Sequence, residues 1–207
     1  DDNLNASIAL LEACKLTNVK KFIFASTSAV YGEPKYFPVD EQHPTNPMSP
    51  YGLSKLMFEV YSEYFSKLNN ISIMNFRLPN VYGARQRADL EGGVIAIFSE
   101  NMKSQKFVKI FGDGKQKRDW VHVKDIIEAF EITLKQKFKY EIIALGSNES
   151  NSINDLFRIL KKQYNYKKKA KKYSKRDGDI KYMIMDGNKA YKKLGWRSKI
   201  SFLKGLK

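Results

Sequence analysis

The stretch KKFIFAS, residues 20–26, decides the fold class of this chain. Its apolar run is short and ends in small polar residues, which is typical of a buried strand in a parallel sheet. A second run of this kind, ISIMNFR, occupies residues 71–77. Between them, Ser49 and Pro50 form a helix-start signal, so we expect a helix over residues 50–68. Helix, strand, loop, helix and strand in this order indicate a doubly wound α/β sheet.

The segments on either side continue this alternation. Residues 4–17 have apolar side chains at helical spacing, and Cys14 lies within that pattern as a packing residue. Ser152 is a plausible N-cap for the helix that follows it. We expect further helices over 93–102, 123–136, 153–164 and a short one ending at 196, and extended segments over 108–112, 118–123 and 140–147. Because no clear linker separates these segments, the pattern predicts two interwoven lobes.

Bulk composition fits an α/β protein of one domain or slightly more. The chain has 207 residues, of which 43% are hydrophobic and 29% charged. Its longest apolar runs are far shorter than the ~20 residues that cross a bilayer, and no signal-peptide pattern is present. A single cysteine excludes an internal disulfide framework and suits the cytoplasm. With only two histidines beside it, widely spaced, we expect no metal site.

The positive charge is concentrated in the second half of the chain. Residues 1–100 carry 9 Lys and Arg against 11 Asp and Glu, whereas residues 101–207 carry 28 against 11. Much of the excess lies in KKQYNYKKKAKKYSKR, residues 161–176, which contains no acidic residue. Such a tract is usually a solvated helix end and loop, and no nucleic-acid-binding motif accompanies it. A non-catalytic module that binds acidic partners through this tract stays an alternative function.

A tyrosine and a lysine are held one helical turn apart in SPYGLSK, residues 49–55. Free tyrosine has a pKa near ~10, and a neighbouring ammonium favours its phenolate form. Tyr51 can therefore act as a base beside Lys55, while the hydroxyl groups of residues 26–28, at the end of the first strand, complete a proton relay. Removing a hydride from the same carbon requires an acceptor that no side chain supplies, so the pattern implies a nicotinamide cofactor. Alone, a Tyr-x-x-x-Lys pair is a weak signal.

The whole chain resembles the extended short-chain dehydrogenase/reductases, and within them the NAD-dependent nucleotide-sugar epimerase/dehydratase family, especially its UDP-glucose 4-epimerase-like members. The resemblance rests on six blocks in the family's order. They are NLNASIALLEACKLTNVKKFIFASTSAVYGEP (3–34), PVDEQHPTNPMSPYGLSKLMFE (38–59), RLPNVYGARQ (77–86), GGVIAIF (92–98), IFGDGKQKRDWVHVKDI (110–126), and R-x-G-D (176–179) with D-x-x-K-A-x-x-x-L-G-W (186–196).

This resemblance implies a role for each matching residue. The catalytic residues would be Thr27, Tyr51 and Lys55. The NAD-binding residues would be Asn3, Ser26, Tyr51, Lys55, Leu78 and Pro79. The residues that bind the nucleotide sugar would be Thr27, Asn80, Val94, Arg118, Arg176, Asp179 and Met183. Among these, the two arginines would grip the diphosphate, which suits the fork geometry of guanidinium. Three of these residues have other interpretations: an ion pair with Asp119 or Asp125 for Arg118, membership of the basic tract for Arg176, and ordinary packing for Met183.

The relay segment indicates which reaction the family resemblance implies. Family 4,6-dehydratases carry Asp-Glu directly after the threonine, and decarboxylating members place a glutamate where Ala29 stands. This chain has Ser28 and Ala29, so neither extra carboxylate is present. The resemblance therefore implies 4-epimerisation of a UDP-hexose through a 4-keto intermediate, with UDP-glucose and UDP-galactose or their N-acetyl forms as substrates. Another nucleotide-sugar reductase or dehydratase of the family remains open.

The resemblance also implies a fold and an assembly. The family begins with a Gly-rich loop that holds the cofactor pyrophosphate, and the sequence matches only the C-terminal two-thirds of its Rossmann-like fold. We therefore expect an N-terminally truncated fragment, with residues 1–83 and 121–148 in the NAD-binding domain and 84–120 and 149–207 in a smaller lobe that binds the nucleotide sugar. Helices 4–17 and 50–68 resemble those through which the family forms homodimers, and Phe58, Tyr61, Tyr64 and Phe65 are the expected aromatic surface.

Overall fold

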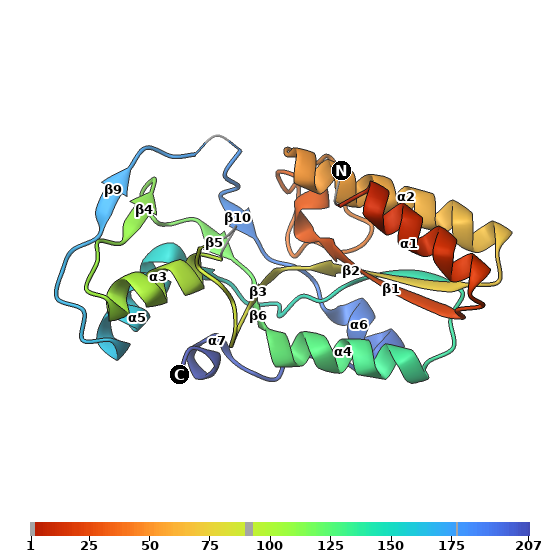
Figure 1. Ribbon diagram of the computed structural model, residues 1–207. Coiled ribbons are helices and arrows are strands. Elements are labelled where there is room, and N and C mark those ends of the chain that lie inside the picture. Colours follow the sequence, from red (N-terminus) through yellow and green to blue (C-terminus); the bar gives the residue numbers. More distant parts are fainter. Residues whose placement is uncertain (1–2, 90–92, 177) are drawn as a thin grey trace.

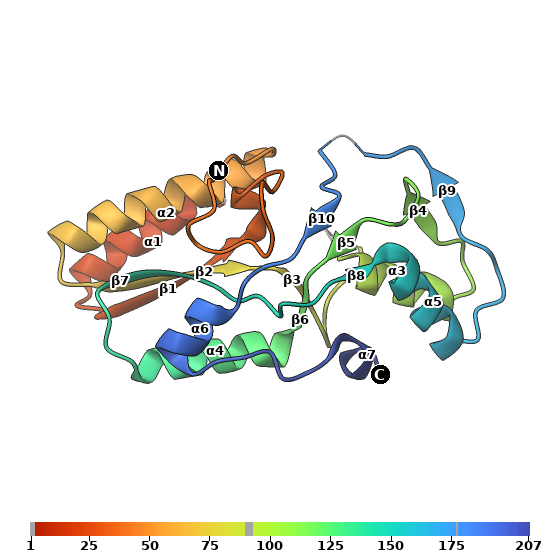
Figure 2. The same cartoon turned by 180° about the vertical axis from the view of Figure 1, so that it is seen from behind.

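A parallel sheet forms the larger half of the molecule. In the computed structural model, which describes residues 3–89, 93–176 and 178–207, its strands run in the order β1 (Lys21–Thr27), β2 (Ser72–Leu78) and β7 (Tyr140–Ala144). The helices α1 (Asn5–Leu16) and α2 (Pro50–Leu68) cover one face, and α4 (Val123–Lys135) and α6 (Asn188–Leu194) cover the other (Figures 1 and 2). Helices on both faces of a parallel sheet confirm the predicted doubly wound α/β fold.

The alternation of side chains along β2 explains why both faces are covered. Ile73 packs with Phe58 and other apolar residues of α1, α2 and β1, whereas Met74 and Phe76 pack on the opposite side with residues of α4 and α6. Successive side chains of a strand point to opposite faces, so a strand with apolar side chains on both faces needs a helical layer on each side. Cys14 is buried in the first of these clusters, which confirms its predicted packing role.

The start of α2 follows from its sequence. The Ser49 hydroxyl accepts a hydrogen bond from the Gly52 N–H at 3.1 Å, and Pro50 occupies the first turn, where no backbone N–H is needed. Two of the four aromatic residues that we expected on the surface of this helix are buried instead, because Phe58 and Phe65 pack against the sheet at 0% and 5% exposure. The Tyr61 hydroxyl donates to Glu12 of α1, and Tyr64 is exposed.

The smaller lobe is built around a second apolar core. The helices α3 (Val94–Lys103) and α5 (Ile153–Gln163) pack there with the parallel pair β4 (Lys109–Phe111) and β9 (Lys171–Tyr173) beside them. A short sheet runs in the order β10 (Tyr182–Met183), β5 (Lys117–Arg118), β8 (Asn151–Ser152). The chain passes between the lobes through the parallel pair of β3 (Asn80–Tyr82) and β6 (Trp120–His122).

Four features of the structure differ from the sequence expectation. Residues 28–30 form a 3-10 helix, η1 (Ser28–Val30), and α7 (Phe202–Gly205) adds an unexpected last turn. Part of the basic tract forms β9, where we expected a helix end and a loop. Residues 188–196, which the predicted boundaries assign to the smaller lobe, pack in the core beneath the larger sheet. The chain therefore returns to the larger lobe before it ends.

Candidate active site

The residues expected to transfer a proton lie at the end of β1 and the start of α2. Thr27 is the last residue of β1, and its Oγ1 accepts a hydrogen bond from the Ala29 N–H at 3.2 Å. Tyr51 lies in the first turn of α2 and is 45% exposed. The Lys55 Nζ lies 5.8 Å from the centroid of the Tyr51 ring and donates to the Ala25 carbonyl oxygen at 3.0 Å. The ammonium is thus tied to β1 beside the tyrosine.

The surroundings of Lys55 strengthen its electrostatic influence. Its side chain is partly buried, and the Nζ lies 4.5 Å above the Phe24 ring. This burial lowers the pKa of Lys55 from its ordinary value. A charge that is partly removed from water acts more strongly on its neighbours, because less solvent screens it. The Lys55 ammonium is therefore less screened by water than a fully exposed one.

Ser26 is placed differently from its predicted role of lining the cofactor. Its side chain is 2% exposed, and its hydroxyl donates to the carboxylate of Glu59 on α2. Side chains of a strand alternate between faces, so Ser26 points under α2. Among the other residues expected near the cofactor, Asn3 is exposed just before α1, Leu78 ends β2 and Pro79 is buried directly after it.

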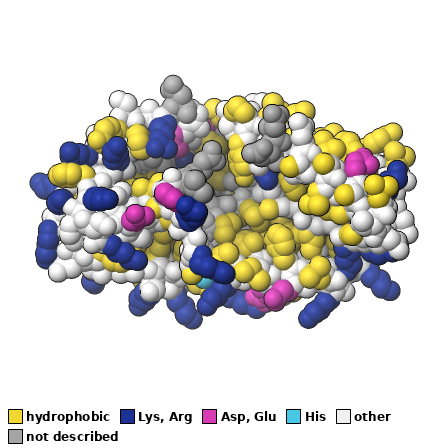
Figure 3. Space-filling view, viewed as in Figure 1, with side chains coloured by type: hydrophobic (Ala, Val, Ile, Leu, Met, Phe, Trp, Pro, Cys, Tyr) yellow, Lys and Arg dark blue, Asp and Glu magenta, His cyan; other side chains and the backbone are white. Residues whose placement is uncertain are grey.

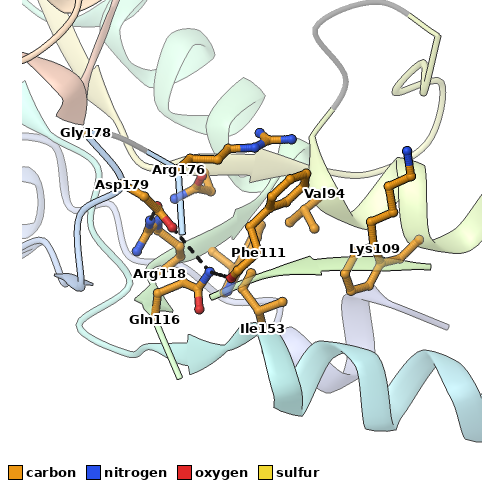
Figure 4. Close-up of a pocket in the computed structure, with 12 residues that line it drawn as sticks. Val94, Lys109, Phe111, Gln116, Arg118, Ile153, Arg176, Gly178 and Asp179 are labelled. Atoms are coloured by element: carbon orange, nitrogen blue, oxygen red, sulfur yellow. Dashed lines mark hydrogen bonds and ion pairs between the residues drawn. The ribbon is translucent and has the colours of Figure 1, made fainter. Parts of the chain in front are cut away.

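A pocket in the smaller lobe gathers five of the seven residues expected to bind the nucleotide sugar. Its volume is about 320 Å³ (Figure 4). The five are Asn80, Val94, Arg118, Arg176 and Asp179, and Phe111, Gln116 and Trp120 also line the pocket. Residues from β3, α3, β5 and the segment after β9 therefore converge on one cavity, although they are up to about a hundred positions apart in the sequence.

Two charged side chains within this pocket, Arg118 and Asp179, form an ion pair. A guanidinium N–H of Arg118 donates to Asp179, and the Gln116 amide donates to the same carboxylate at 3.3 Å (Figure 4). Burial lowers the pKa of Arg118, and the charge of Asp179 opposes this shift. Arg118 thus pairs with neither Asp119 nor Asp125, the partners considered from the sequence. The Arg176 guanidinium lies 3.8 Å from the centroid of the Phe111 ring.

Phe111 and Gln116 were not identified from the sequence as site residues. Both lie in the block 110–126 that carries the family resemblance, but the block does not reveal which of its side chains face a cavity. Conversely, Met183 is not a lining residue of this pocket. It is 2% exposed and packs with Val30, Val39 and other buried residues. The structure therefore favours ordinary packing for Met183.

Asp119 connects the two lobes through buried hydrogen bonds. Its carboxylate accepts from the Ser147 N–H and hydroxyl and from the Met185 N–H at 3.1 Å, and its backbone carbonyl accepts from the Asn80 N–H at 3.1 Å. Burial raises the pKa of Asp119 to about 7. Asp119 therefore holds the pocket residue Asn80 against the segments that follow β7 and β10.

The basic tract lies along the outer edge of the smaller lobe, where Figure 3 shows a concentration of Lys and Arg side chains. Some of its charges rest on aromatic rings. The Nζ atoms of Lys168 and Lys171 lie 4.7 Å and 4.0 Å from the centroid of the Phe107 ring. These contacts order an exposed surface without forming an enclosed site. Within the described ranges, we find neither a cluster of acidic, histidine and cysteine side chains that could hold a metal ion nor a helix with the length and apolar character needed to cross a membrane.

Comparison with known families identifies the chain at the level of its family. The sequence profile of the NAD dependent epimerase/dehydratase family matches residues 1–146. The chain belongs to this family. The family is NAD-dependent, which confirms the predicted cofactor class. The segment that joins Thr27, Tyr51 and Lys55 lies inside the matched range.

Relatives in this NAD-dependent epimerase/dehydratase family resemble the chain over its whole length. The structure of UDP-glucose 4-epimerase from Thermotoga maritima with UDP-glucose superposes with a TM-score of 0.94 at 39% identity, covering 99% of this chain and 66% of the other. UDP-N-acetylglucosamine 4-epimerase from Methanobrevibacter ruminantium, in complex with UDP-N-acetylmuramic acid, superposes with a TM-score of 0.92 at 32% identity, covering 99% and 66%. UDP-glucuronate 4-epimerase of Thermodesulfobacterium geofontis is 36% identical over 209 residues, which are 100% of this chain and 63% of that protein.

These comparisons show the family of the chain. The three relatives are named for three different UDP-sugars. This chain spans about two-thirds of the length of such relatives. The exposed Tyr51 and the partly buried Lys55 fit a nicotinamide riboside, because an ammonium and a phenol on the same helical face can bind its ribose hydroxyls.

Proposed function

We propose that this protein catalyses NAD-dependent 4-epimerisation of a UDP-hexose. The observation that carries the proposal is the convergence of Arg118, Arg176, Asp179 and Asn80 on one pocket of the smaller lobe. Two guanidinium groups suit the two phosphates of a nucleotide sugar, and a carboxylate suits the hydroxyl groups of a ribose. Phe111 offers an aromatic face at the same pocket, on which a base can stack.

The protein side chains of the larger lobe would move the proton. Tyr51, as phenolate with the Lys55 ammonium beside it, would take the proton of the sugar 4-hydroxyl as general base and, then as phenol, return it as general acid. Thr27, whose Oγ1 accepts from Ala29 N–H, would direct its own proton toward the sugar oxygen. Lys55 would in addition bind the ribose of the cofactor. When bound, NAD supplies the hydride acceptor that no side chain provides.

The relay segment supports epimerisation over dehydration or decarboxylation. Ser28 and Ala29 begin the 3-10 helix directly after Thr27, so neither of the two residues that follow the relay threonine carries a carboxylate. Elimination of water from the neighbouring carbons needs an additional acid and base at this point. Oxidation at C4, rotation of the 4-keto sugar and reduction of its other face need none. We propose UDP-glucose and UDP-galactose, or their N-acetyl forms, as substrates, and the cytoplasm, which suits the single cysteine, as the compartment.

The test is turnover by the full-length protein. UDP-galactose is incubated with NAD, and UDP-glucose is measured with a coupled dehydrogenase. We expect turnover in the wild type and a loss of about 10²- to 10⁴-fold in Tyr51→Phe, because the variant lacks the proton-transferring oxygen. Tyr191→Phe, the same change at an exposed position on α6, is the matched control and should leave turnover unchanged. Equal turnover in Tyr51→Phe and the wild type would exclude Tyr51 as the base, and no turnover of any UDP-hexose by the wild type would exclude the function.

A further inference from the structure

A polar stripe on α2 runs from an exposed start at Tyr51 to buried residues that face the sheet. Tyr51, Lys55 and Glu59 follow one another at intervals of four residues, so they lie on the same side of the helix. The stripe continues through Ser62 and Ser66, both of which are 0% exposed. Surface helices usually turn an apolar stripe toward a sheet. Here polar side chains occupy part of the contact, so their hydrogen-bond partners determine what the stripe does.

Glu59 forms a bidentate ion pair with Arg77 of β2 in the interior. The two side chains are 2% and 5% exposed. Arg77 Nε lies 3.1 Å from Glu59 Oε1, and Arg77 Nη2 lies 2.7 Å from Oε2. The Ser26 hydroxyl, from the position opposite Arg77 on β1, donates to the same carboxylate. One carboxylate therefore joins α2 to two neighbouring strands.

Backbone and side-chain hydrogen bonds extend this attachment to the third strand. The Glu59 carbonyl accepts from the hydroxyl of Tyr140 on β7 at 3.0 Å. The Ser62 hydroxyl accepts from the side-chain amide of Asn75 on β2 at 3.1 Å. The helix is thus tied to β1, β2 and β7 by directional contacts centred on one residue, Glu59.

Directional contacts fix the position of a helix along a sheet, which apolar packing alone leaves adjustable. Apolar burial is non-directional, and replacing a buried ion pair by apolar residues is often neutral or stabilising, so stability alone does not explain this pair. The pair lies beside the groups of the proposed chemistry: Lys55 is one turn before Glu59, and Thr27 directly follows Ser26. A slip of one residue would move the helix by about 1.5 Å along its axis, and a misplacement of that size can cost about 10²-fold in rate.

We propose that Glu59 and Arg77 are positioning residues that hold Tyr51 and Lys55 of α2 in register with Thr27 of β1. The proposal rests on the proposed function, since it assigns the pair to the geometry of that reaction. The pair lies inside the larger lobe, whereas the nucleotide-sugar pocket is formed by other elements. Loss of the pair should therefore lower kcat and leave the binding of the UDP-sugar intact.

The test compares two neighbouring glutamates of α2 in the full-length protein. Glu59→Gln removes the buried charge and keeps the side-chain volume. Glu63→Gln removes an exposed charge that pairs with Lys67 and serves as the matched control. We expect kcat to fall by about 10²-fold in Glu59→Gln with KM for UDP-galactose within about twofold of the wild type, and both constants to stay unchanged in Glu63→Gln. If Glu59→Gln does not fold, Arg77→Lys keeps the charge but loses the fork and should show the same split between kcat and KM.

A second measurement does not depend on activity. Hydrogen exchange of backbone amides over residues 52–58 should be faster in Glu59→Gln than in the wild type, while exchange over residues 157–163 of α5 stays the same. A variant that is less stable overall but keeps its kcat and its local exchange would overturn the proposal, because the pair would then serve stability alone. If the wild type turns over no UDP-hexose, the proposed function fails, and the exchange experiment still decides whether the pair fixes α2.

Discussion

Replacing Arg118 by methionine should weaken the binding of UDP. The guanidinium carries five N–H donors. One of them bonds the Lys117 carbonyl at 3.0 Å and another bonds Asp179, so donors remain for a phosphate oxygen. A hydrogen bond to a charged group contributes about 1.5–3 kcal/mol, and 1.4 kcal/mol corresponds to a factor of ten in Kd. Loss of one such bond should therefore raise Kd for UDP by about 10- to 150-fold. Methionine keeps most of the apolar stem, so the change isolates the guanidinium.

The assay is titration calorimetry of UDP against the full-length protein, which measures binding without turnover. Arg118→Lys keeps the charge but loses the fork, and its Kd should rise by about tenfold or less. Arg158→Met removes a guanidinium that is 79% exposed on α5 and is the matched control, with an unchanged Kd. If Arg118→Met binds UDP as tightly as the wild type, the diphosphate is not held at this pocket, and our assignment of the smaller lobe is wrong.

Three further predictions concern stability, assembly and the basic tract. Burial raises the pKa of Asp119 from 3.8 to about 7. Its contribution to the free energy of unfolding is therefore present below about pH 4 and is lost as the pH rises through 7. The midpoint of thermal unfolding should show this decline in the wild type and not in Asp119→Asn. Val60 is 65% exposed on α2, within the proposed dimer face. Light scattering should therefore show a monomer for Val60→Glu and still a dimer for Leu134→Glu on α4. A monomeric wild type would refute the dimer. Changing Lys167 and Lys169 to Gln should leave turnover unchanged if the tract is a solvated surface, whereas salt-sensitive heparin retention lost in this variant would favour the alternative binding module.

Local sequence signals were sufficient to predict the elements that carry the site. The helix expected over residues 50–68 has those bounds in the structure because Ser49 caps it and Pro50 fixes its first turn. The helix after Ser152 begins as expected, with reciprocal hydrogen bonds between Ser152 and Asp155. Capping is a local interaction, so neighbouring residues are enough to predict it. The long-range placement of Arg118, Arg176 and Asp179 in one pocket came instead from the family resemblance.

Side-chain orientation could not be predicted in the same way. A glutamate and an arginine are normally surface residues, so nothing near Glu59 or Arg77 in the sequence indicates that they meet in the interior. Phe58 and Phe65 are aromatic residues of the kind found at interfaces, but the face of α2 that carries them packs against the sheet. Met183 lies in a segment that matches the family, yet its side chain points into the core because β10 pairs with β5. These outcomes depend on contacts between distant segments.

The two proposed sets of functional residues lie in different lobes, and this separation affects how the substrate specificity of such proteins can change. The residues proposed to move the proton stand on β1 and α2, whereas those proposed to grip the nucleotide sugar come from β3, α3, β5 and the segment after β9. Changes in these few pocket segments can therefore alter which sugar is bound, while the reactive groups on β1 and α2 stay the same. A chimaera that carries the pocket segments of a paralogue on the sheet of this protein would acquire the substrate specificity of the paralogue and keep the reaction of this protein.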